Sequence, residues 1–255
     1  MRKNLIFKLF IGLLFSMMAS SAFAQDGSIL GMPALTSSVG ENGEATYSLS
    51  LQILVLMTVL TLVPSIVLGM TAFTRVIIVL SILRQALGTQ QTPPNQVLIA
   101  IALFITFYVM SPIFEILYET ALNPYLEGTT SAQAALSIAT DLLKEFMVAN
   151  TRSSTMNMFA EMAGEGPFED TQAIPLSIVL PSFITSELKT AFEIGFLIFM
   201  PFLVIDFVIA SILMSLGMMM LSPMLISLPF KLLLFVLVDG WAMTIGSLSS
   251  TFVVG

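Results

Sequence analysis

Four long and nearly uncharged stretches constrain this chain more than any other feature of its sequence. They cover residues 49–70, 96–118, 194–214 and 223–248. A helix needs about 20 mostly apolar residues to cross the hydrocarbon core of a bilayer. Charged residues make up 10% of the 255 residues, against about 25% in soluble domains, so charge is too scarce to cover a soluble surface. We therefore predict an all-α membrane protein.

Each apolar stretch contains or borders a proline: Pro64, Pro112, Pro201 and Pro223. A proline inside a helix frees a carbonyl group and bends the chain. In lipid, the freed backbone groups must be satisfied by neighbouring helices. The pattern predicts two proline-kinked helical hairpins packed in a bent bundle. The first covers residues 48–118 and the second covers residues 190–255.

The N-terminal residues 1–24 are typical of a cleaved signal peptide. They begin with a basic segment, continue with a short apolar core, and end in an Ala-x-Ala motif at Ala24. The alternative is a first transmembrane helix, but the apolar core is shorter than the ~20 residues that a span needs. Residues 25–47, rich in Gly, Ser, Thr and Glu, predict a flexible periplasmic tail.

The loops differ in charge. Residues 71–95 carry Arg75 and Arg84 but no acid, whereas residues 119–189 are strongly acidic. Cytoplasmic loops carry an excess of Lys and Arg, so Arg75 and Arg84 are predicted to be cytoplasmic-edge anchors. The acidic region 119–189 is then periplasmic, as are both ends of the mature chain.

The acidic region is predicted to contain two helices. Thr130 to Gln133 fits a capping box at the start of the first, and Asn150 is a plausible stop. The second is expected from about Ser153 to Ala163, ended by Gly164. Such a short amphipathic pair cannot bury a core by itself, so it should pack on the membrane part or on a neighbour.

Several classes of function are excluded by composition. The chain has no cysteine and no histidine, which removes thiol nucleophiles, histidine-based dyads and the usual zinc ligands. It has no glycine-rich phosphate-binding loop. The net charge of −7 argues against nucleic-acid binding. We predict no enzymatic activity, no cofactor and no metal site.

Three charges lie inside apolar stretches: Asp206, Lys231 and Asp239. A charge at mid-membrane costs about 2.5–3.5 kcal/mol on insertion scales. The charges could relay protons or ions, as in an ion-coupled transporter. They could form ion pairs between helices or subunits, for example Asp206 with Lys231. They could also lie near an aqueous boundary, with Lys231 snorkelling.

A denser cluster of charges precedes the third apolar stretch. It comprises Glu187, Lys189 and Glu193, of which Lys189 and Glu193 are i,i+4 neighbours on the expected helix. One interpretation is a solvated helix start. The other is a surface that binds an assembly partner.

Three consecutive methionines, Met218, Met219 and Met220, follow Gly217 in the short connection of the second hairpin. Tight turns normally take polar residues or glycine. Soft apolar side chains could close a central hole shared by several copies and still deform around a passing chain. The alternative is a turn buried against lipid.

Two long segments resemble the signatures of a known family. Residues 181–196, PSFITSELKTAFEIGF, and residues 229–241, PFKLLLFVLVDGW, resemble the FliP family of flagellar biosynthetic proteins and their type III secretion relatives. Residues 70–75 and 217–220 are also similar to the family. The resemblance extends over residues 47–255.

The resemblance implies a pore-forming structural subunit of the flagellar type III export gate, which conducts unfolded flagellar subunits across the inner membrane at the basal body. It implies a homo-oligomer, ring-like and pentamer-like, with FliQ-like and FliR-like subunits, further export apparatus membrane proteins and lipid as partners. It also implies that the hairpins can sit partly outside the bilayer plane. An ion-coupled transporter remains the alternative.

The resemblance also implies roles for individual residues. Met218, Met219 and Met220 would form a gasket that seals the closed pore. The charged residues of the motifs and apolar stretches would act in assembly or gating: Glu187, Lys189, Glu193, Asp206, Lys231 and Asp239.

Overall fold

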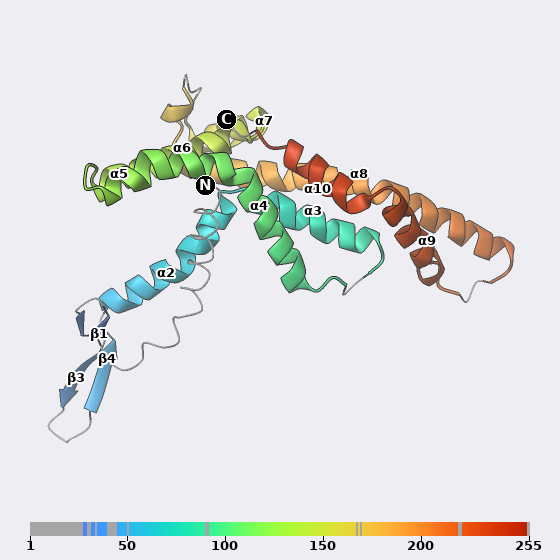
Figure 1. Cartoon of the computed structure of the whole chain (residues 1–255), viewed down its shortest axis with the longest axis horizontal. Helices are drawn as coiled ribbons and strands as arrows, with labels where there is room; N and C mark the ends of the chain where they lie inside the picture. The colour runs from blue at the N-terminus through green and yellow to red at the C-terminus, as the bar shows by residue number, and fades with distance from the viewer. Residues whose placement is uncertain are drawn as a thin grey trace. The chain divides into compact units, whose positions relative to one another are not determined.

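The computed structural model describes residues 28–29, 32–33, 35–39, 45–49, 51–89, 92–166, 168, 170–218 and 221–253 (Figure 1). The chain divides into two compact units, Met1–Pro64 and Ser65–Gly255. The predicted signal peptide, residues 1–24, lies outside the described residues.

The first unit contains two antiparallel pairs of short strands where a flexible tail is predicted. Strand β1 (Ser28–Ile29) pairs with β2 (Met32–Pro33), and β3 (Leu35–Val39) pairs with β4 (Ala45–Leu49). These strands lie in the segment before Leu51, for which the sequence predicted a tail and no helix. Its composition resembles that of a disordered tail, but β3 and β4 are rich in the β-branched and aromatic residues that favour strands.

From Leu51 onward, every regular element is helical within the described residues, as predicted. The helices are α2 (Leu51–Gly69), α3 (Phe73–Ala86), α4 (Asn95–Leu117), η2 (Tyr118–Leu122, a π-helix), α5 (Asn123–Leu126), α6 (Ala132–Ala149), α7 (Ser153–Ala163), η3 (Thr171–Ala173, a 3₁₀-helix), α8 (Leu176–Ser215), α9 (Pro223–Leu237) and α10 (Gly240–Ser250).

The helices α6 and α7 match the two predicted in the acidic region. Ser131 is the N-cap of α6 and accepts a hydrogen bond from the backbone N–H of Ala134, so the cap lies one residue after the predicted Thr130. Asn150 ends α6, and Gly164 ends α7 in the left-handed conformation. These caps were predictable because each depends on a local residue pattern.

Two helical segments are long and apolar enough to cross a membrane, Asn95–Leu126 and Leu176–Ser215. Two more candidates are bent pairs, Leu56–Gly69 with Phe73–Ala86 and Pro223–Leu237 with Gly240–Ser250. The described part of the chain thus has two to four candidate spans. The helix α8 continues through Pro181 and Pro201, and the predicted region boundary between residues 189 and 190 falls inside it.

The break between α9 and α10 was not predicted from the sequence. Asp239 has a positive φ of 49°, and the chain turns by 64° there. Gly240 follows, and a Cβ atom at Gly240 would overlap the ring of Phe235. A residue without a side chain is therefore needed at the first position of α10.

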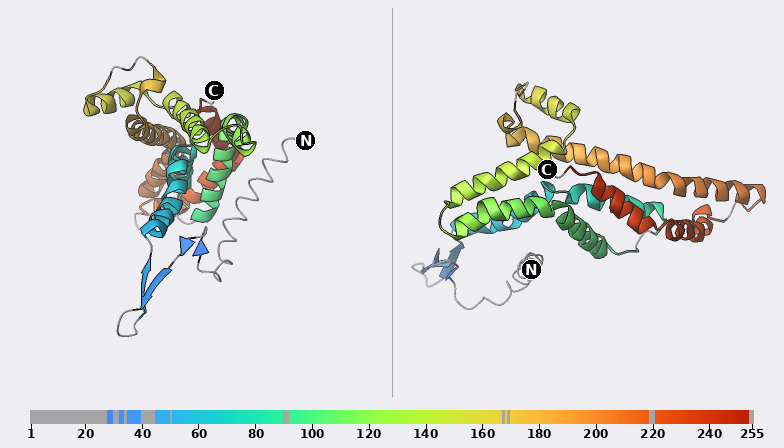
Figure 2. Two further views of the ribbon diagram at one scale, coloured as in Figure 1. Left: turned by 90° about the vertical axis from the view of Figure 1, so that its left-hand side faces the viewer. Right: turned by 45° about the horizontal axis from the view of Figure 1, so that its top comes forward.

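The core of the second unit forms where α3 packs against both α4 and α8 (Figures 1 and 2). Val76 and Leu80 of α3, Met110 of α4 and Phe183 of α8 are fully buried. Burying a large apolar side chain contributes about 1.5–3 kcal/mol. A second, smaller cluster joins the end of α3 to α8 and α9, and it includes the ring pair Phe202–Phe235.

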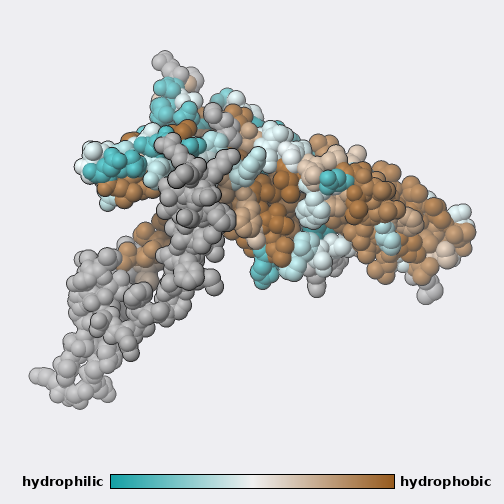
Figure 3. Space-filling view, viewed as in Figure 1, coloured by the Kyte–Doolittle hydropathy of each residue, from teal (hydrophilic) through white to brown (hydrophobic). Residues whose placement is uncertain are grey.

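The apolar surface left uncovered is concentrated on α8 and α9. Helix α9 packs along the C-terminal half of α8, and the outer faces of both helices are hydrophobic (Figure 3). The exposed side chains there include Leu197, Val204, Phe207, Leu233 and Val236. Surface of this extent in one patch is typical of contact with lipid or with other subunits.

Candidate functional site

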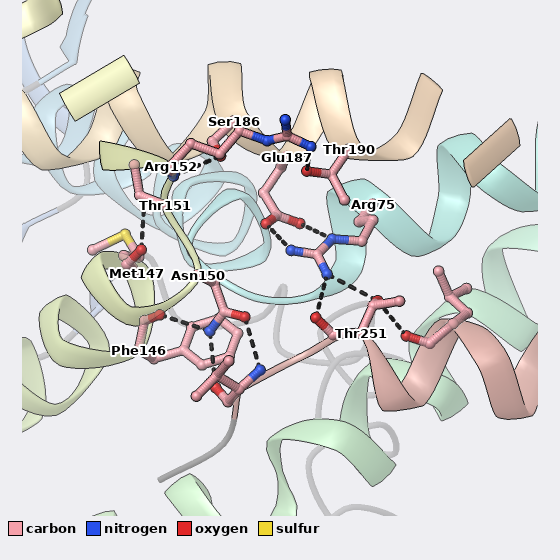
Figure 4. Close-up of polar contacts among 12 residues, drawn as sticks. Arg75, Phe146, Met147, Asn150, Thr151, Arg152, Ser186, Glu187, Thr190 and Thr251 are labelled. Atoms are coloured by element: carbon pink, nitrogen blue, oxygen red, sulfur yellow. Dashed lines mark hydrogen bonds and ion pairs between the residues drawn. The ribbon is translucent and has the colours of Figure 1, made fainter. Parts of the chain in front are cut away.

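A buried ion pair joins α3 to α8. Arg75 donates from Nε to Oε2 of Glu187 at 2.8 Å and from Nη2 to Oε1 at 2.5 Å (Figure 4). The side chains of Arg75 and Glu187 are 3% and 0% exposed. Two parallel charge-assisted hydrogen bonds fix distance and orientation together. The pair therefore sets how the two helices cross.

The C-terminal end of α10 completes the surroundings of Arg75. Nη1 of Arg75 donates to the carbonyl oxygen of Thr251 at 3.0 Å and to its Oγ1 at 2.9 Å. The guanidinium carbon lies 3.9 Å from the centre of the Phe252 ring, a cation–π contact. Removing this charge from water is costly, and these contacts offset that cost. Among the described residues, no buried side-chain nitrogen or oxygen lacks a partner.

Asn150 holds the same C-terminal segment from the side of α6. Its Nδ2 donates to the carbonyl oxygen of Val253 at 2.9 Å, and its Oδ1 accepts from the backbone N–H of Val253 at 3.0 Å. The buried ring of Phe252 stacks on Phe146 at 6.5 Å. Through these contacts, α3, α6, α8 and α10 meet at one buried polar centre.

A second ion pair lies at the edge of this centre. Arg152, at the start of α7, pairs with Glu193 of α8. Its backbone N–H also donates to Oγ of the fully buried Ser186 at 3.0 Å. Lys189 and Glu193 are i,i+4 neighbours on α8, as predicted, and the ion-pair partner of Glu193 is Arg152. The side chains of Arg152 and Glu193 are 36% and 50% exposed, so this pair is only partly shielded from solvent.

The third ion pair joins α8 to α9. Nζ of Lys231 donates to Oδ2 of Asp206 at 2.6 Å, and Oγ of Ser227 donates to Oδ1 of Asp206 at 2.6 Å. Lys231 is 3% exposed and Asp206 is 34% exposed. Of the three interpretations left open by the sequence, the structure supports an ion pair between helices.

Arg75 and Arg84 have different surroundings, although both lie on α3. Nη1 of Arg84 donates to Oδ1 of Asn95 at 2.6 Å, which ties the end of α3 to the start of α4. Arg75 lies in the core instead of at an edge. Sequence reasoning missed its pairing with Glu187 because the positive-inside pattern already accounted for both arginines.

Comparison with known proteins identifies the family to which a chain with this geometry belongs. The model of the FliP family matches residues 56–248. The chain belongs to the FliP family. The three ion pairs found among the described residues of this FliP-family chain lie within the matched range.

Curated relatives named flagellar biosynthetic protein FliP include those of three bacteria. The relative from Cereibacter sphaeroides is 64% identical over 222 residues, covering 87% of this chain and 73% of the relative. The relative from Pectobacterium carotovorum is 49% identical over 242 residues, covering 95% and 91%. The relative from Bacillus subtilis is 50% identical over 205 residues, covering 80% and 93%. The predicted family is confirmed.

The remaining predicted residues do not join the ion pairs of this FliP-family chain. Lys189 and Asp239 are exposed, and neither has an ionic or hydrogen-bonded side-chain partner among the described residues. Met218 is 38% exposed at the end of the α8 turn. Met219 and Met220 lie outside the described residues. Within the described part of the chain, no cluster of three or more acidic side chains could hold a metal ion.

Proposed function

We propose that this chain is a pore-forming structural subunit of the flagellar type III export gate in the bacterial inner membrane. Membership of the FliP family makes it a non-enzymatic membrane component of flagellar biosynthesis. The proposal adds that several copies form a ring-like, pentamer-like oligomer with FliQ-like and FliR-like subunits. Unfolded flagellar subunits would pass through its centre, and part of the chain would face the periplasm.

The observation that carries the proposal is the combination of internally neutralised charges and uncovered apolar surface. The charges of Asp206 and Lys231 are paired within the chain. By contrast, Phe207, Val236 and Leu237 are 65%, 75% and 74% exposed on the same two helices. A surface of this kind favours packing against other subunits, because the costly charges have already been removed from it.

The turn after α8 is consistent with the proposed methionine gasket. Gly217 has a positive φ of 72°, and the backbone N–H of Met218 donates to the carbonyl oxygen of Leu213 at 2.9 Å. This closes the helix in the manner of a glycine C-cap. The thioether of Met218 is left exposed, at a position where several copies could bring their methionines together.

The alternative of an ion-coupled transporter requires a site near mid-membrane, usually with broken helices and free polar groups. Asp206 and Lys231 were the candidates for that site. Each is engaged by a close partner, and α8 is continuous past Asp206. These contacts favour a structural role.

The experiment that tests the proposal is native mass spectrometry of the chain extracted in mild detergent, expressed with and without FliQ-like and FliR-like subunits. We expect a discrete homo-oligomer that recruits both partners. A stable monomer or dimer that ignores the partners would overturn the proposal and favour the transporter.

A further inference from the structure

Two opposite charges on α8 and at the α9–α10 bend have no side-chain partner among the described residues. The described residues include six cationic side chains: Arg75, Arg84, Lys144, Arg152, Lys189 and Lys231. Five of them contact an acidic, amide or carbonyl oxygen of the same chain. Within that described set, Lys189 is the exception.

Acids without an ion pair occur elsewhere in the described residues, for example Asp141 and Glu161, whereas the ion-paired acids lie in the C-terminal part of the chain. From residue 187 onward the described acids are Glu187, Glu193, Asp206 and Asp239. The first three each form an ion pair within the chain. Asp239 forms none among the described residues, and it is exposed at the bend between α9 and α10.

Lys189 stands beside an apolar groove. The groove has a volume of about 700 Å³, and its apolar lining consists of Phe192, Phe196 and Phe199 of α8 together with Ile82 of α3. Lys189 and Glu193 also line it, and the carboxylate of Glu193 is already paired with Arg152. Phe192 and Phe196 are 61% and 60% exposed. Rings exposed to this degree next to an unpaired ammonium group would be covered best by an apolar partner that also carries a negative charge.

The bend between α9 and α10 is a surface that is both apolar and negatively charged. Val236 and Leu237 are 75% and 74% exposed, and they directly precede Val238 and the unpaired Asp239. The bend therefore presents apolar side chains beside a carboxylate. It is complementary in polarity and charge to the groove on α8.

We propose that the α9–α10 bend of one copy docks against the α8 groove of the next copy, with Asp239 paired to Lys189. The inference rests on the proposed oligomer. Because groove and bend are different surfaces of one chain, the contact is heterologous, and it can repeat from copy to copy until a ring closes or a short helix forms. Lipid tails would cover the rings of Phe192 and Phe196 but would give the carboxylate of Asp239 no cationic partner. A second copy would cover the rings and also supply that partner.

Disulfide cross-linking tests the contact directly, because the chain contains no cysteine. Lys189→Cys is placed on a full-length chain with one epitope tag, and Asp239→Cys on a full-length chain with another. The two are expressed together with the partner subunits and oxidised in detergent. We expect a cross-linked dimer that carries both tags. The matched control replaces Asp239→Cys with Asp141→Cys, at an exposed acid on α6, and should give no such dimer.

Charge exchange provides the second measurement. Lys189→Glu and Asp239→Lys should each reduce the assembled fraction about tenfold, as expected for loss of a close interfacial charge pair. The double variant should recover assembly. An oligomer seen by native mass spectrometry without the two-tag dimer, or with an equally strong control dimer, would overturn the contact and leave the proposed function standing. Absence of any oligomer would overturn both.

Discussion

At the scale of single residues, the stability of this protein depends on which charged side chains are buried and which are exposed to solvent. The carboxylate of Glu187 is fully buried and accepts two hydrogen bonds from Arg75. Glu193, six residues further along α8, is half exposed and pairs with Arg152. The two glutamates have similar partners, but the burial of one makes its loss far more costly.

The first prediction compares these two glutamates. Glu187→Gln should destabilise the folded chain by about 3–5 kcal/mol, because Arg75 would remain buried without a counter-charge. Glu193→Gln should cost less than about 1 kcal/mol. Thermal unfolding in detergent, followed by the fluorescence of the single tryptophan Trp241, measures both. Equal losses would show that burial does not govern the Arg75–Glu187 pair.

The second prediction concerns the Asp206–Lys231 pair. Asp206→Asn should prevent assembly of the complex, because it leaves the ammonium group of Lys231 buried with no opposite charge. Asp206→Asn combined with Lys231→Met should recover part of the assembly, since neither charge then remains. Blue-native electrophoresis of membranes measures the assembled fraction. Normal assembly of Asp206→Asn with loss of export alone would instead support a proton relay.

These pairs show how far the sequence can predict contacts between residues. Pairing of Asp206 with Lys231 was foreseeable, because two costly charges of opposite sign lie in neighbouring apolar stretches. Pairing of Arg75 with Glu187 was not, because 112 residues separate them and Glu187 sits in a charged run typical of a solvated helix start. Helical geometry separates that run, since Glu187 is buried and Lys189 is exposed.

At the scale of secondary-structure elements, local residue patterns predicted the helix ends, whereas the break inside the last apolar stretch was not predicted. The ends of α6 and α7 followed from Asn150 and Gly164. The division of the last apolar stretch into α9 and α10 did not, because apolar composition does not reveal a backbone turn at Asp239. The small residue next to it, Gly240, was the available signal.

The third prediction tests why Gly240 is a glycine. Gly240→Ala should destabilise the chain by about 1–3 kcal/mol, the usual cost of overpacking, because the new methyl group would overlap the ring of Phe235. Gly246, also in α10, has nothing within 4 Å of an added Cβ atom. Gly246→Ala should therefore be neutral or stabilising by up to about 1 kcal/mol. Opposite signs in the two melting shifts are the expected result, and a harmless Gly240→Ala would contradict the packing at the bend.

At the scale of the whole molecule, composition predicted a membrane protein and the structure supplies two to four candidate spans. Composition could not predict how far each apolar helix faces lipid or another subunit, because both surroundings favour the same side chains. The distribution of charge is more informative. The buried charges of Arg75, Glu187 and Lys231 are in ion pairs within the chain, whereas Lys189 and Asp239 are exposed and have no side-chain partner among the described residues.

The fourth prediction follows from the proposed oligomer and concerns its pore. Replacing Met218, Met219 and Met220 by alanine should leave assembly unchanged, because Met218 lies exposed at the end of a helix and outside the core. It should make the assembled complex leak ions, because three short side chains per copy cannot fill the opening that three flexible thioethers would close. Conductance of purified complexes in planar bilayers measures the leak. The control is Met162→Ala, at an exposed methionine on α7, and complexes of this variant should not conduct ions. An ion barrier unchanged in the triple variant would show that the three methionines do not close the pore, and would favour a turn buried against lipid.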